Sequence, residues 1–150
     1  MVKKVFNLVK IGVSLALVSA CGGGGSGQLL YDSMPNGILS ISGGPVFNFG
    51  NRLLESETVR EFTVTNIGSG SALEITGSFY FSLAFSYLGG QYPGQGGTCG
   101  SSLAPNSSCT VVVRFKPKSM GETQTTLQLN YHNGTTLVVT SNPILLGSGI

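Results

Sequence analysis

Few side chains in this 150-residue sequence could take part in catalysis. It contains one histidine, His132, and one aspartate, Asp32, which lie far apart in the chain. A hydrolase needs a nucleophile, a general base and a group that orients the base. His132 precedes Asn133-Gly134, a strong hairpin signal, and a solvated polar residue is expected beside such a turn. The sequence therefore predicts a protein that is not an enzyme, and a small hydrolase that uses His132 is the alternative.

Three glutamates, Glu55, Glu57 and Glu61, cluster around the expected start of a strand. No second group of metal ligands accompanies them, so they are interpreted as charges that discourage pairing at a strand edge. The glycine-rich run at residues 22–27 formally fits the dinucleotide pattern G-x-G-x-x-G. However, no expected strand precedes it and no expected helix follows it. We expect neither a metal site nor a cofactor.

The N-terminal segment carries the features of an export signal in their required order. Three lysines lie within residues 1–10, residues 11–18 are apolar, and Ala20 precedes Cys21. The apolar run of residues 11–20 is well short of the roughly 20 residues that span a bilayer. This segment resembles a bacterial lipoprotein signal, and the alternative is an ordinary cleaved signal or a membrane helix with a cysteine nearby by chance.

The lipoprotein resemblance implies a signal peptide over residues 1–20 and cleavage before Cys21. It also implies that a lipid such as palmitate is attached to that cysteine. In the lipoproteins that the segment resembles, a glycine rather than an aspartate after the cysteine permits transfer to the outer membrane. Residues 21–37 then form the lipidated cysteine and a flexible, glycine-rich tether, and the membrane is an expected partner through the lipid.

Lipidation of Cys21 would leave two of the three cysteines, Cys99 and Cys109, as a pair. An exported compartment is oxidising enough to keep them joined. The loop between them is short, so a disulfide is expected to stabilise the fold by roughly 2.5 to 3 kcal/mol. A buried free thiol and an unrelated loop thiol are the alternative.

The net charge argues against nucleic acid as a partner. Of the eight lysines and arginines, three lie in the signal, and the remaining five face six acidic residues, which gives a mature net charge near −1. Arg114, Lys116 and Lys118 form the only basic cluster, which fits the solvent face and rim of one strand.

Residues 109–116 alternate cleanly between the two faces of an extended strand. The inward set is Cys109, Val111, Val113 and Phe115, and the outward set is Thr110, Val112, Arg114 and Lys116. Pro117 lacks the N–H that a ladder needs, so the strand should end at Lys116. Cys109 begins the inward face, and a bridge to Cys99 would tie the preceding loop to the core.

Short extended segments with turn signals between them recur along residues 38–150, and no sustained helical period is present. The expected strands cover residues 38–41, 46–49, 58–66, 72–76, 109–116, 123–132 and 135–140, and residues 143–146 end the domain. About seven such strands predict an all-β, immunoglobulin-like antiparallel sandwich that forms one domain. Phe62 and Val64 should face the core of this sandwich, with Thr63 and Thr65 facing out.

Several motifs in this order resemble the bacterial choice-of-anchor D domain. They are FGN at 49–51, FTVTNIGSG at 62–70, GGQYPGQGGTCG at 89–100, SCT at 108–110, FKP at 115–117 and LGSG at 146–149. That group is similar in fold to the abnormal-spindle and hydin type of immunoglobulin-like domain, itself close to major sperm protein. The resemblance covers residues 38–150 and implies a surface or envelope β-sandwich whose pattern contains no catalytic residues.

We therefore expect a non-catalytic, lipid-anchored envelope protein with a structural or partner-binding role. Binding is expected in the glycine-rich loop Gly89–Gly97, with Tyr87, Gln91 and Tyr92 as contact residues for a protein or surface partner. Without the disulfide this loop should be mobile. A strand-donating assembly or chaperone-like factor is the second hypothesis.

Overall fold

A computed structural model describes residues 36–150, apart from the side chains of residues 141 and 142. The expected signal peptide, Cys21, the tether and Asp32 all lie outside the described residues. Every regular element in the described range is a β-strand. The nine strands are β1 Leu39–Ile41, β2 Val46–Arg52, β3 Thr58–Asn66, β4 Ala72–Phe79, β5 Phe85–Tyr87, β6 Ser102–Leu103, β7 Ser108–Phe115, β8 Gly121–His132 and β9 Leu137–Gly149.

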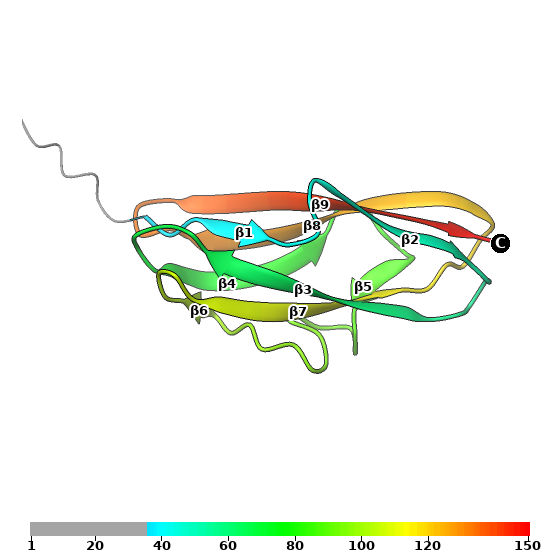
Figure 1. Cartoon of the computed structure of the whole chain (residues 1–150), viewed down its shortest axis with the longest axis horizontal. Helices are drawn as coiled ribbons and strands as arrows, with labels where there is room; N and C mark the ends of the chain where they lie inside the picture. Colours follow the sequence, from blue (N-terminus) through cyan, green and yellow to red (C-terminus); the bar gives the residue numbers. More distant parts are fainter. Residues whose placement is uncertain (1–35) are drawn as a thin grey trace, which may run out of the picture. The chain divides into compact units, whose positions relative to one another are not determined.

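The strands form two layers, which confirms the immunoglobulin-like sandwich (Figure 1). The first sheet has the order β1-β3-β7-β5 and the second has the order β2-β9-β8-β4-β6. All neighbouring strands are antiparallel except β2 and β9, which run parallel. The sandwich is thus antiparallel, as expected, with one parallel pair at the β2 edge.

The parallel pair arises because the chain changes sheets between β1 and β2. β1 pairs with β3 in the first sheet, and β2 pairs with β9 in the second. The crossing passes through Gly43 and Gly44, whose positive φ angles of 101° and 72° suit glycine. The Ile144 N–H then donates to the Pro45 carbonyl at 2.9 Å and begins the parallel pairing. The kink predicted between residues 41 and 46 is thus a change of sheet.

Aromatic side chains from β2 join the two sheets in the core. The Phe47 ring lies 5.1 Å from that of Phe62, and the Phe49 ring lies 5.5 Å from those of Phe85 and Phe115. Phe85 and Phe115 stack at 4.6 Å. Burying large apolar rings between the sheets is the main driving force for this packing. Phe62 and Val64 are buried, and the outward positions of Thr63 and Thr65 are also confirmed.

The long hairpin of β8 and β9 forms the centre of the second sheet. The connection at residues 133–136 contains the predicted Asn133-Gly134, but it is longer than a two-residue hairpin turn, so β9 begins at Leu137. The inward face of β8 is buried. β9, however, continues to Gly149, although the returning strand was expected only over residues 135–140. Residues 142 and 143 both lie opposite Leu127, so the proline occupies a bulge where no ladder hydrogen bond is lost.

Buried Asn66 holds the turns at one end of the sandwich. Its Nδ2 group donates to the carbonyl oxygens of Gly70 at 2.8 Å and Leu103 at 2.9 Å. Its Oδ1 atom accepts from the N–H groups of Ile38 and Gly68, both at 3.0 Å. One amide thus connects β1, the turn after β3, and β6. All four hydrogen bonds are made, as a buried amide requires.

The described chain begins and ends at opposite ends of the sandwich (Figure 1). Gly37 donates to the Asn133 carbonyl beside the β8–β9 turn, whereas Ile150 donates to the Arg52 carbonyl, both at 2.9 Å. Within residues 36–150 there is no helix that has the length and apolar character needed to cross a membrane.

Candidate functional site

The loop Gly89–Gly97 follows β5 and lies along one edge of β7. The Leu88 N–H donates to the Val112 carbonyl at 2.9 Å, and the Val112 N–H donates to the Pro93 carbonyl at 2.8 Å. Further along, the Thr98 N–H donates to the Thr110 carbonyl at 3.0 Å. β5 pairs only with residues 113–115 of β7, so the loop takes over pairing where β5 ends.

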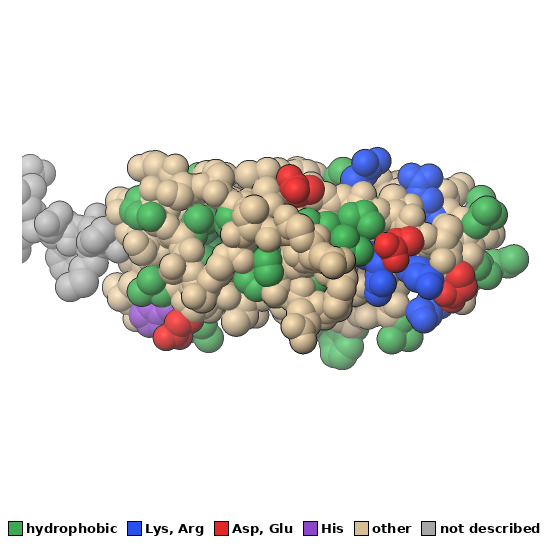
Figure 2. Space-filling model, turned by 90° about the horizontal axis from the view of Figure 1, so that it is seen from below, with side chains coloured by type: hydrophobic (Ala, Val, Ile, Leu, Met, Phe, Trp, Pro, Cys, Tyr) green, Lys and Arg blue, Asp and Glu red, His purple; other side chains and the backbone are tan. Residues whose placement is uncertain are grey.

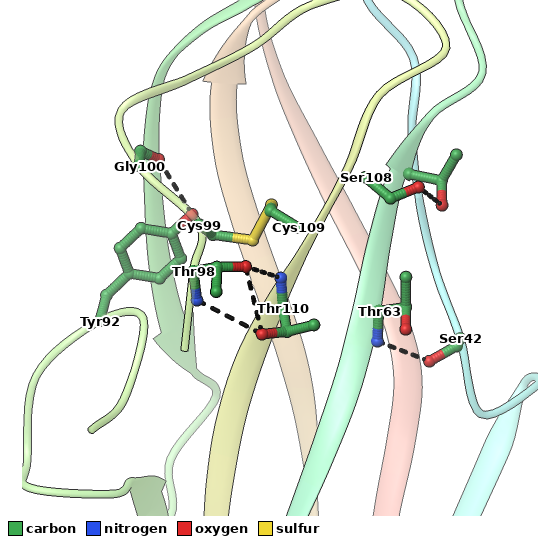
Figure 3. Close-up of a disulfide and its surroundings, with 10 residues drawn as sticks. Ser42, Thr63, Tyr92, Thr98, Cys99, Gly100, Ser108, Cys109 and Thr110 are labelled. Carbon is green, nitrogen blue, oxygen red and sulfur yellow. Dashed lines mark hydrogen bonds between the residues drawn. A yellow bond between two sulfur atoms is a disulfide. The ribbon is translucent and has the colours of Figure 1, made fainter. Parts of the chain in front are cut away.

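A disulfide joins Cys99 to Cys109 next to this edge, as predicted from the sequence (Figure 3). Their Cα atoms lie 4.8 Å apart, and both residues are buried. Thr98 and Thr110 add a second connection one residue away, because the Thr110 N–H donates to the Thr98 Oγ1 at 2.9 Å. The C-terminal end of the loop is therefore fixed by both a covalent bond and hydrogen bonds.

Two residues in this region lie deeper than the sequence predicted. Val112, expected to face out, is only 6% exposed, because the loop covers it. A Cβ atom on Gly94 would collide with the Val112 backbone, so glycine permits this close approach. Tyr87, expected to be an exposed contact residue, is 4% exposed and packs against Phe79 at a ring distance of 4.8 Å. Tyr87 is therefore a core residue and cannot contact a partner directly.

Tyr92 is half-buried and closes the loop. Its hydroxyl donates to the Gly100 carbonyl at 3.2 Å (Figure 3). Its ring lies edge-on to that of Tyr87 at a centroid distance of 5.6 Å. Burial raises the pKa of the Tyr92 phenol to about 12. Burial, assisted by the nearby Tyr92, also raises the pKa of Tyr87 well above its ordinary value. Both phenols are neutral at physiological pH, so neither serves as a base there.

The fully exposed side chains of the loop are both amides. Gln91 and Gln95 are exposed, and residues 88–113 contain no charged side chain. Gln91 was predicted as a contact residue and Gln95 was not, although its place two residues before Gly97 in a polar loop could have suggested it. The loop can thus offer hydrogen bonds to a partner but no ionic contact. Whether it binds one stays a prediction.

The remaining candidate residues lie elsewhere. His132 lies at the β8–β9 turn, where its Nδ1 atom accepts a hydrogen bond from the Gly134 N–H at 3.2 Å. Glu55 pairs with Lys116 at 3.1 Å and Glu57 pairs with Arg114 at 3.5 Å. The hydrogen bond and charge of Lys116 lower the pKa of Glu55.

Figure 2 shows positive and negative side chains interspersed over one half of the visible face. This mixing agrees with the two ion pairs that join the β2–β3 turn to Arg114 of β7 and to Lys116 directly after it. Within residues 36–150, no three His, Cys, Asp or Glu side chains gather in a way that could hold a metal ion.

A second exposed feature was not predicted. The turn between β4 and β5 projects Tyr80, Phe81 and Leu83, of which Phe81 is 86% and Leu83 92% exposed. Five aromatic residues lie within residues 79–87, and they divide between the core and the surface. Only Phe79, Phe85 and Tyr87 of that run pack into the core.

Comparisons with known proteins identify the fold. The sequence matches no protein-family model and no curated protein sequence. Among solved structures, the chain is similar to the ASH/PapD-like domain of human CEP192, PapD-like domain 7. The TM-score is 0.52 at 15% identity, and the match covers 94% of this chain and 97% of that one.

It is also similar to part of the Vibrio cholerae VesB protease, with a TM-score of 0.57 at 21% identity. This match covers 73% of the present chain but only 31% of the VesB chain. At these identities the likeness concerns the fold alone. The chain therefore has an immunoglobulin-like β-sandwich fold, similar to that of the PapD-like domain.

Proposed function

We propose that the protein is a non-catalytic, lipid-anchored module of the bacterial envelope that binds a partner through the loop Gly89–Gly97. The observation that carries the proposal is the fixed conformation of this loop on β7. Hydrogen bonds to Val112 and Thr110 and the Cys99–Cys109 disulfide hold it in place. A loop that is already ordered loses little conformational entropy on binding, so exposed amides can contribute most of their interaction energy.

The lipid anchor rests on the order of residues before Cys21, which resembles a lipoprotein signal. Two or more acyl chains at this cysteine would attach the chain stably to a membrane. The motifs at 49–51, 62–70 and 89–100 support membership in the choice-of-anchor D group, whose pattern contains no catalytic residues. The outer membrane is the proposed destination, because Gly22 follows Cys21.

Replacement of the two exposed glutamines of the loop by alanine tests partner binding. We expect the Gln91→Ala/Gln95→Ala variant of the full chain to lose a protein that co-purifies with the native chain from detergent-solubilised envelopes. Neither side chain packs in the core, so the melting temperature should not change. Undiminished co-purification by this variant would exclude the loop as the binding surface.

The strand-pairing hypothesis is supported by one specific feature, an open edge on β3. β1 pairs only with residues 64–66 of β3, and Ser42 bonds with Thr63. Peptide groups alternate along a strand, so those of Val59 and Glu61 point to the same side as those of Thr63. On this side, away from β7, no described strand pairs with the peptide groups of Val59 and Glu61. Such an edge can accept an added strand.

The charges beside this edge weaken the strand-pairing hypothesis. Arg60 occupies an inward position of β3 yet is exposed, and Glu61 lies on the outward face. Charged residues at such positions discourage strand addition. Val59→Pro removes an N–H that points away from β7, so the sandwich should tolerate it. Loss of co-purification in this variant, with retention in the Gln91/Gln95 variant, would favour strand pairing over loop binding.

A further inference from the structure

The outer face of the second sheet carries a regular grid of side chains across β2, β9 and β8. Residues in register form three rows. The rows are Val46–Ile144–Thr126, Asn48–Leu146–Gln124 and Asn51–Ser148–Glu122. The surface thus changes from apolar to polar along the strands. The middle strand contributes Ser148 in the polar row, whereas its neighbours contribute longer side chains.

A bulge in β2 brings two amides onto this face. Asn48 and Asn51 pair with Leu146 and Ser148, which are only two residues apart, so β2 has one extra residue here. In a regular strand, residues three apart face opposite sides. Gly50, with a φ of 75°, provides the extra residue and adds no side chain between the two asparagines.

These features produce a depression of about 340 Å³. The middle strand β9 contributes Leu146, Gly147 and Ser148 to its lining. Asn48 and Asn51 form one wall, and Glu122 and Gln124 form the other. The volume lies at the lower end of the range for small-molecule sites.

The polar groups around the depression are largely available for a ligand. The Asn48 Oδ1 atom accepts from the Gly50 N–H at 2.7 Å, which orients the amide and leaves its NH₂ group without a partner among residues 36–150. The side chains of Asn51, Glu122 and Gln124 make no hydrogen bond to any other described side chain or backbone group. Three amides and one carboxylate therefore provide both donors and acceptors.

We propose that this depression binds a neutral saccharide. Sugar hydroxyls both donate and accept hydrogen bonds, as the amides of Asn48, Asn51 and Gln124 do. The aliphatic side chains of Leu146, Ile144 and Val46 lie beside the amides and fit the C–H faces of a pyranose ring. No cationic side chain lines the depression, which disfavours phosphate or carboxylate ligands.

This site is independent of the proposed loop interaction. The depression lies on the second sheet, whereas the loop Gly89–Gly97 borders β7 in the first sheet. Saccharide binding also requires no lipid at Cys21. Either proposal can therefore fail without affecting the other.

Saturation-transfer difference NMR can test the proposal with the full chain in a detergent that contains no sugar. Chitotetraose and cellotetraose serve as neutral probes, because one carries N-acetyl groups and the other does not. We expect transfer to the ring protons of at least one probe. The Asn51→Ala/Gln124→Ala variant should bind that probe roughly tenfold more weakly, because two hydrogen-bonding side chains are lost.

Gln128→Ala provides the matched control. Gln128 lies on the same strand and the same outward face as Gln124 but outside the depression, so its removal should leave binding unchanged. Absence of transfer to both probes would overturn the proposal. Equal binding by the native chain and the Asn51/Gln124 variant, with equal melting temperatures, would overturn it as well.

Discussion

The backbone N–H of Val112 donates to the carbonyl oxygen of Pro93 at 2.8 Å. This bond allows the loop Gly89–Gly97 to take the place of a strand beside β7, since β5 pairs with only three residues of that strand. An uncovered edge would offer its peptide groups to other chains. The loop therefore closes the sheet and at the same time holds Gln91 and Gln95 at the surface.

Removal of the disulfide should lower stability but keep the fold. We expect Cys99→Ser/Cys109→Ser to reduce the free energy of unfolding by roughly 3 kcal/mol, which is the entropy of closing a short loop. The melting temperature should fall by several degrees, with an unchanged β-sheet circular dichroism spectrum. Alkylation of the non-reduced native protein provides the check, because both cysteines should be protected. Reaction of both with the reagent would show that no bridge exists.

Alkaline pH should destabilise the protein through Tyr87 and Tyr92. An unfolded tyrosine ionises near pH 10, whereas burial raises the pKa of Tyr92 in the folded state to about 12. The stability contributed by the buried, neutral phenol is therefore fully present below about pH 10 and is lost as the pH rises towards about 12. Urea unfolding at increasing pH measures the slope with which the free energy of unfolding falls.

The slope should be smaller in Tyr92→Phe, since one of the two phenols is gone. Tyr80 is 60% exposed, so Tyr80→Phe serves as the control and should keep the native slope. A native-like slope for Tyr92→Phe would contradict the role of its burial.

Asn66→Ala should be among the most destabilising polar substitutions. It leaves the carbonyls of Gly70 and Leu103 and the N–H groups of Ile38 and Gly68 without their partner. A loss of about 2 to 4 kcal/mol in the free energy of unfolding is expected. Asn130→Ala on the outward face of β8 should cost less than about 0.5 kcal/mol. Equal losses for the two variants, measured by urea unfolding, would rule out this role of Asn66.

Cys21→Ser should release the chain from the membrane or mislocalise it. The lipoprotein signal places the acyl chains on this cysteine, and serine cannot carry them in the same way. Membrane fractionation and labelling with a fatty-acid probe measure the change. Unaltered fractionation, together with no labelling of the native chain, would disprove the anchor.

Local patterns predicted the strands that have one buried and one solvated face. The alternation around Phe62 and Val64 is an example, and the pairing of Cys99 with Cys109 followed from cysteine arithmetic. These features depend on neighbours in sequence or on a simple count. They are therefore visible without knowledge of the fold.

Features set by distant segments could not be predicted in this way. Val112 is buried because the loop that contains Pro93, far earlier in the chain, covers its outward side. Pro143 is tolerated inside β9 because a bulge places it opposite Leu127. The depression at Asn48 and Asn51 requires the register of three strands, which no single strand pattern contains.

Site-specific photo-cross-linking at Gln91 tests the central proposal most directly. A photoreactive amino acid at this position of the full chain, in cells that naturally express the protein, should give one discrete cross-linked species. The same amino acid at Ser69, exposed in the turn between β3 and β4, is the control and should give none. A species from Ser69 but not from Gln91, or none from either, would contradict partner binding by the loop Gly89–Gly97.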